Sequence, residues 1–156
     1  MLSDVAHTSS GQVPLSAVDF GIQLRQAQHV LSLRIDDALR PVGLNLGLWR
    51  VMRELAHSPG ASAAEVGRAS LHTSQTVGGL LQRLEDQGLV ERSEGRGRIV
   101  ENHLTPQGVK LLRRATSAAD KAISGTLAGL DAADIAQASR FLTQYVAALT
   151  SPPEHD

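Results

Sequence analysis

The feature that most constrains the fold is an amphipathic stretch near the middle of the chain, from Leu71 to Gly88. Its apolar residues recur three and four positions apart, at Val77, Leu80, Leu81 and Leu84. This spacing places them on one face of a helix. The opposite face carries hydroxyls, amides and glycines, from Ser74, Gln75, Gly78, Gly79 and Gln82. A helix that buries its leucines and presents small polar groups is suited to enter the major groove of DNA.

A shorter helix is expected directly before this one. Ser62 and Glu65 have the spacing of a capping box, which predicts a helix that starts there and ends near Ser70. Thr73 or Ser74 then caps the amphipathic helix, and Gly88 ends it. Two helices joined by a tight turn, the second with a polar outer face, are typical of a helix-turn-helix.

A β-hairpin is expected after Gly88. Its first strand is predicted at Leu89–Arg92, its turn at Glu94–Arg98 with two glycines, and its second strand at Ile99–Leu104. Three arginines lie on or beside the tip, at Arg92, Arg96 and Arg98. Long cationic side chains on such a tip are suited to contact a DNA groove or the phosphate backbone.

Four further helices flank these elements. They are expected at about Ser16–Leu39, Leu44–Ala56 and Pro106–Leu127, and from Asp131 to about Leu149. The fold class is therefore mainly α with a small β-hairpin wing. The first and last helices carry more apolar positions than one such domain can bury, which predicts a dimer formed by the N- and C-terminal helices.

These elements predict one winged helix-turn-helix domain at 16–150. Within it we expect dimerisation helices at 16–40 and 106–150 and a DNA-binding part at 44–104, with a disordered arm at 1–15 and a disordered tail at 151–156.

The net charge of −1 hides an asymmetry along the chain. Residues 68–114 carry a net +3 and residues 115–156 a net −3, so the positive charge accompanies the amphipathic helix, where DNA phosphates would be met.

The chain has no cysteine and its six histidines are scattered, so we expect no disulfide, metal or cofactor. No catalytic motif is present, and no apolar run approaches the ~18 residues of a membrane span, so we expect a cytoplasmic protein that is not an enzyme.

Two stretches together resemble the MarR (multiple antibiotic resistance regulator) family of winged helix-turn-helix transcription factors. They are Thr76-Val77, followed by Leu80 to Arg92, and the later Leu104-Thr105-Pro106-Gln107-Gly108. The resemblance covers roughly Leu24 to Leu149. It implies a homodimer that binds a pseudo-palindromic operator in double-stranded DNA, usually represses, and is commonly released by a small phenolic or anionic ligand.

Two departures from the family pattern change the expected DNA contacts. Gly78-Gly79 stands where the family often has polar side chains, which removes two potential base-reading groups and brings the backbone nearer to DNA. Arg96 stands where the family commonly has the wing aspartate that orients the tip arginine, here Arg98.

The expected DNA-binding residues are Thr73, Ser74, Gln75, Thr76, Gly79, Gln82, Arg83, Arg92, Arg96 and Arg98. Gln75 and Gln82 are candidates for base contacts, and the hydroxyls for phosphate contacts. Three alternatives stay open from the residues themselves: Thr73 is a cap alone, Arg92 pairs with a neighbouring carboxylate, and Arg83 forms a structural ion pair.

Ligand-binding candidates are Arg25, His29, Trp49 and Arg53. Members of each pair lie one helical turn apart, and an aromatic ring beside a guanidinium suits an aryl carboxylate. Alternatively, Trp49 is a core residue and the charges are solvated. Two other functions also remain open: a winged-helix module that binds protein, and a DNA-binding regulator without an effector.

Overall fold

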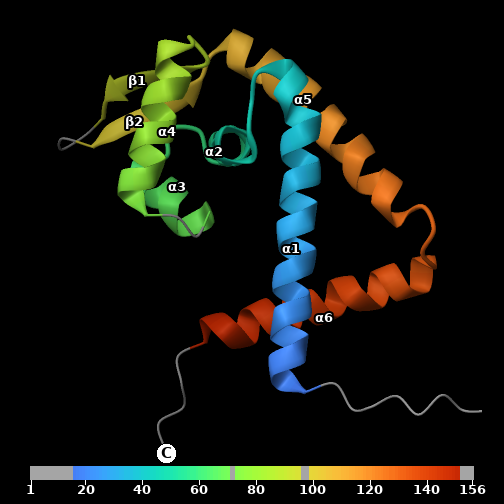
Figure 1. Ribbon diagram of the computed structural model, residues 1–156. Helices are drawn as coiled ribbons and strands as arrows, with labels where there is room; N and C mark the ends of the chain where they lie inside the picture. Colours follow the sequence, from blue (N-terminus) through green and yellow to red (C-terminus); the bar gives the residue numbers. More distant parts are fainter. Residues whose placement is uncertain (1–15, 71–72, 96–98, 152–156) are drawn as a thin grey trace, which may run out of the picture.

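The computed structural model describes residues 16–70, 73–95 and 99–151. Helices make up most of it, with one antiparallel hairpin, which confirms the expected fold class (Figure 1). The order is α1 (Ala17–Leu39), a 3-10 turn (Arg40–Val42), α2 (Leu46–His57), α3 (Ala63–Ser70), α4 (Ser74–Asp86), β1 (Val90–Glu94), β2 (Val100–Leu104), α5 (Pro106–Leu127) and α6 (Ala132–Thr150).

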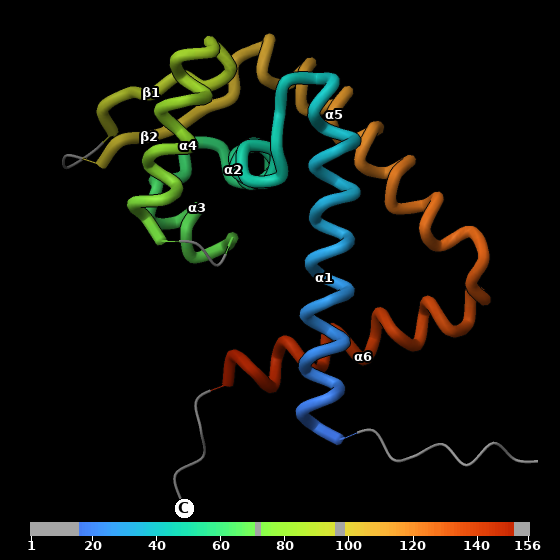
Figure 2. Tube along the Cα trace, viewed as in Figure 1, coloured from blue at the N-terminus to red at the C-terminus, as the bar shows by residue number. Residues whose placement is uncertain are grey.

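The chain divides visually into a winged body and three long helices (Figure 2). The body consists of α2, α3, α4 and the β1–β2 hairpin. Helices α1 and α5 lead away from the body, and α6 crosses α1 near its far end. The recognition-type helix α4 therefore lies at the opposite side of the molecule from α6.

Several helices begin directly after a residue whose side chain caps them. Side chains of Ser16, Thr73 and Thr105 each accept a hydrogen bond from the backbone three residues later, at 3.0–3.1 Å. The Ser62–Glu65 capping box is confirmed, with Ser62 N donating to Glu65 Oε2 at 2.8 Å and Glu65 N to Ser62 Oγ at 3.3 Å.

The boundaries of α2 and of the strands differ slightly from expectation. Helix α2 begins two residues later than predicted because Asn45 caps it, accepting from Leu48 N at 2.9 Å. Strand β1 extends to Glu94 rather than ending at Arg92, because its pairing with β2 runs from Val90↔Leu104 to Glu94↔Val100. Helix α4 ends as predicted, at Gly88 with φ +68°.

The core lies between α2, α4, the hairpin and the adjacent parts of α1 and α5. Its fully buried side chains include Leu39, Leu48, Met52, Leu55, Val66, Val77, Leu81, Leu84 and Val90. Gly108 lets α5 approach the hairpin, since a Cβ there would lie 2.1 Å from Leu89 O. Thr105 Oγ1 also donates to Gly88 O at 2.8 Å, so the end of α4 and the start of α5 are fixed together.

Helix α6 stands outside this core and has no buried residue. It contacts α1 through an aromatic cluster, in which Phe20 lies edge-on to Phe141 and Tyr145 with ring centroids 5.6 and 5.5 Å away. None of the helices among the described residues is both long enough and apolar enough to cross a membrane.

Candidate nucleic-acid interface

In the N-terminal half of helix α4, the apolar face is buried and the polar face is exposed. Val77 and Leu81 are fully buried against the body, whereas Ser74, Gln75 and Thr76 are exposed. Thr73 is the cap of α4: its Oγ1 accepts from Thr76 N at 3.1 Å and lies 2.9 Å from the Thr76 hydroxyl. The exposed start of α4 therefore presents an amide, hydroxyls and unpaired backbone N–H groups together.

The glycine pair continues this surface along α4. An added Cβ at Gly78 or Gly79 would meet no heavy atom of the described residues within 4 Å, so packing among those residues requires neither glycine. The pair makes this part of the helix flat, and another surface can approach its backbone closely.

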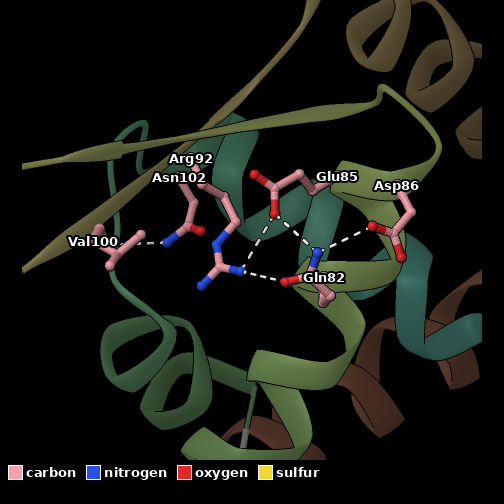
Figure 3. A network of polar contacts seen from close by, with 6 residues as sticks. All are labelled: Gln82, Glu85, Asp86, Arg92, Val100 and Asn102. Carbon is pink, nitrogen blue, oxygen red and sulfur yellow. Dashed lines mark hydrogen bonds and ion pairs between the residues drawn. The ribbon is translucent and has the colours of Figure 1, made fainter.

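The C-terminal half of the helix differs, because Gln82, Glu85 and Asp86 are bonded to one another or to Arg92 (Figure 3). Gln82 Oε1 accepts from Arg92 Nη1 at 2.9 Å. Gln82 Nε2 donates to Glu85 Oε2 at 3.2 Å and to Asp86 Oδ1 at 3.0 Å. Of the expected base-contacting residues, both glutamines are exposed on α4, but only Gln82 is bonded to neighbouring side chains among the described residues.

The arginines have three different situations. Arg92 forms an ion pair with Glu85 at 3.4 Å, which is the alternative the sequence left open for it. Arg83 is exposed and forms no ion pair with any described residue. Arg96 and Arg98 lie outside the described residues.

The candidate ligand residues form two separate pairs. Trp49 is buried, its Nε1 donates to Thr116 Oγ1 at 3.2 Å, and the Arg53 guanidinium lies 4.9 Å from its ring centroid. Arg53 lines a hollow of about 440 Å³ between α2 and α3, whereas Arg25 and His29 line another of about 520 Å³ on α1. Within the described residues of a single chain, the Arg25–His29 pair and the Trp49–Arg53 pair therefore share no pocket.

Sequence reasoning missed one residue of this region, Asn102 on β2. It is 1% exposed, and its Nδ2 donates to Ala61 O at 2.8 Å. The signal for it was strand alternation, because Asn102 shares a face with Leu104 and a buried amide there needs partners.

Comparison with known proteins identifies the family. A model described as "MarR family" matches residues 42–99. The HTH-type transcriptional repressor Rv2887 of Mycobacterium tuberculosis is 36% identical over 124 residues, which cover 78% of this chain and 89% of Rv2887.

Solved structures agree in fold. The crystal structure of M. tuberculosis MarR family protein Rv2887 with p-aminosalicylic acid has a TM-score of 0.68 at 34% identity, covering 80% of this chain and 96% of that one. The Rv2887 complex with DNA has a TM-score of 0.68 at 33% identity, covering 84% and 97%. A MarR family regulator from Rhodococcus sp. RHA1 shares the fold, with a TM-score of 0.78 at 22% identity and coverage of 85% and 96%.

Members of this family are transcriptional regulators and not enzymes. Both the identity and the coverage of Rv2887 support the assignment that the motifs around α4 and the start of α5 predicted. This chain belongs to the MarR family of winged helix-turn-helix transcriptional regulators.

Proposed function

We propose that the protein is a homodimeric, cytoplasmic repressor that binds a pseudo-palindromic operator in double-stranded DNA and is released by a small aromatic anion. The observation that carries the proposal is α4, whose apolar face is fully buried while its N-terminal half presents exposed polar groups. The relative Rv2887, at 33% identity, has been crystallised in complex with DNA, which supports DNA binding by this chain.

In this proposal the start of α4 enters the major groove. Gln75 is exposed and carries an amide, the group that bonds adenine through two hydrogen bonds. Ser74, Thr76 and the capping region at Thr73 contact phosphate, aided by the backbone N–H groups of the helix start. Gly79 permits close approach of the backbone to DNA.

The arginines supply the contacts that do not depend on sequence. Arg83 is exposed on α4 and contacts phosphate in this proposal. Arg96 and Arg98 belong to the segment that joins β1 to β2, and they remain predicted wing contacts. Arg92 stands apart from them because it already pairs with Glu85.

The homodimer is supported by the surfaces of α1 and α6. Their exposed apolar side chains include Val18, Ile22, Val30, Leu33, Phe141, Leu142, Val146 and Leu149. Together with the end of α5, α6 lines an apolar groove of about 760 Å³. A second copy packed through these helices would cover this surface and place two α4 helices on one operator.

The ligand class rests on Trp49 and Arg53 and on the relative. Rv2887 has been crystallised with salicylic acid and with p-aminosalicylic acid. Arg53 over the Trp49 ring offers a guanidinium to a carboxylate beside an aromatic surface. Arg25 and His29 form a second cationic surface, on α1. Titration of Trp49 fluorescence with salicylate tests the proposal, and Arg53→Gln should weaken the response.

Fluorescence anisotropy with the duplex upstream of the protein's own gene tests DNA binding. We expect nanomolar-range affinity that falls steeply with salt, and at least a thousandfold preference over a scrambled duplex. Gln75→Ala should reduce the preference more than the affinity. Equal binding to both duplexes with little salt dependence would refute the proposal and favour a protein-binding module.

A further inference from the structure

Arg92 and Asn102 face each other across the hairpin. They are paired residues of β1 and β2, between the pairs Val90↔Leu104 and Glu94↔Val100. Directly opposite residues project to the same side of a sheet, with Cβ atoms about 4.5–5.5 Å apart. Figure 3 shows the two side chains beside each other on the side that faces α4.

Each of these side chains has one buried polar atom without a hydrogen-bond partner among the described residues. The atoms are Arg92 Nε, which is a donor, and Asn102 Oδ1, which is an acceptor. A buried donor and a buried acceptor on facing residues are chemically complementary, because the N–H can donate to the amide oxygen.

The other atoms of both residues reach different parts of the body. Asn102 binds the turn between α2 and α3 through two groups. Its side-chain Nδ2 donates to Ala61 O at 2.8 Å, and its backbone carbonyl oxygen accepts from Gly60 N at 3.0 Å. Arg92 binds α4, through Gln82 at 2.9 Å and Glu85 at 3.4 Å. The pair therefore stands where the hairpin meets α4 and the turn that precedes α3.

We propose that Arg92 and Asn102, with Gln82 and Glu85, form a wing-positioning cluster that holds the hairpin at a fixed orientation to α4. Arg92 and Gln82 are then positioning residues and make no direct DNA contact. The role of the cluster in DNA binding rests on the proposed function. Its role in fixing the orientation of the hairpin relative to α4 does not. It predicts that base choice depends on the N-terminal half of α4, where Gln75 is exposed.

Distance measurements between spin labels test the geometry without DNA. The chain has no cysteine, so Gln87→Cys at the C-terminal cap of α4 and Glu94→Cys on β1 give two defined labels per chain. Labelled chains are diluted with unlabelled protein, so that distances within one chain dominate. We expect a single narrow distance distribution, broadened by Arg92→Lys and by Asn102→Leu. An unchanged distribution in both variants would overturn the cluster.

A further variant tests the Arg92–Asn102 pairing itself. Asn102→Asp keeps an acceptor beside Arg92 Nε but loses the donor to Ala61 O, so it should broaden the distribution less than Asn102→Leu, which loses both contacts. Broadening equal to that of Asn102→Leu would refute the pairing. Circular dichroism of each variant confirms that the helices are retained.

DNA affinity separates positioning from direct contact. Lysine keeps a charge for a phosphate but cannot bond Gln82, Glu85 and Asn102 together. We therefore expect Arg92→Lys to lose about tenfold in affinity, as Arg92→Met does, with the salt dependence unchanged. Lys110→Met on α5 is the matched control for loss of a positive charge.

If Arg92→Lys instead binds like the wild type while Arg92→Met is weaker and less salt-dependent, Arg92 contacts phosphate and the positioning role is wrong. Absence of specific binding by the wild-type protein would refute the proposed function, and the label distances would still decide whether the cluster exists.

Discussion

The winged body and helix α6 bury their apolar residues to opposite extents. In the body, Leu48, Met52 and Leu84 have no measurable exposure. On α6, Val146 is 52% and Leu149 66% exposed, and no residue of the helix is buried. The body thus buries its apolar residues within one chain, whereas α6 exposes the apolar surface on which the proposed dimer rests.

The strongest test of this difference is to place charge on α6. The double variant Leu142→Asp, Val146→Asp should dissociate the dimer, because two carboxylates would have to be buried without partners. Operator affinity should fall by about a thousandfold or more, since each monomer holds a single α4. Sedimentation equilibrium gives the mass and anisotropy the affinity.

Gln137→Asp is the control for that variant, because it adds a charge to α6 away from the residues that line the groove. A double variant that remains a dimer with unchanged affinity would show that α6 is not the interface.

The second test compares truncation of a leucine in each region. Leu84→Ala should lower the free energy of unfolding by about 2–5 kcal/mol, because it opens a cavity in a packed core. Leu149→Ala should lower the stability through the dimer instead, so its effect on the melting temperature should depend on protein concentration. Thermal unfolding over a hundredfold range of protein concentration distinguishes the two variants. If both melting temperatures depend on concentration in the same way, the body and α6 do not differ as described.

The third test concerns α4, the part of the body proposed to meet DNA. Gly78→Ala and Gly79→Ala should each raise the free energy of unfolding by about 0.8–1 kcal/mol, because alanine is the better helix former and nothing lies near the added Cβ. Operator affinity should nevertheless fall for Gly79→Ala if the backbone approaches DNA there. Chemical unfolding and anisotropy measure the two effects, and a stabilised variant with full affinity would mean that the glycine serves no close contact.

The smallest expected effect is at the start of α3. Hydrogen bonds from the Ser62 backbone N–H and hydroxyl lower the pKa of Glu65 below its ordinary value of 4.5. A lowered carboxyl pKa stabilises the folded protein above the unfolded-state pKa, and this contribution is lost as the pH falls through the folded-state pKa. Wild type should therefore exceed Glu65→Gln in stability at neutral pH, with the difference shrinking below about pH 4.5. A difference that does not change with pH would contradict the capping role.

Local signals in the sequence predicted most of the fold. Ser62 with Glu65, Thr73, Gly88 and Thr105 mark helix ends through bonds to residues only a few positions away. For that reason the ends of α3, α4 and α5 were predictable without knowledge of the tertiary structure.

The candidate site was less predictable because its side chains depend on distant partners. Gln82 was predicted to face DNA from its position on α4, but its bond to Arg92 depends on how the hairpin folds back. Asn102 bonds Ala61, 41 residues earlier, and no short-range pattern shows that contact. Likewise, helical spacing paired Arg25 with His29 and Trp49 with Arg53, but it could not show that Trp49 is buried in the core or that Arg53 lines a different hollow from Arg25 and His29.

Native mass spectrometry of the protein alone and on its operator duplex tests the central claim most directly, that α6 needs a second chain while each body presents one α4 to DNA. We expect two chains per particle without DNA and two chains on one duplex. A single chain in both samples, or one chain per bound duplex, would contradict the account.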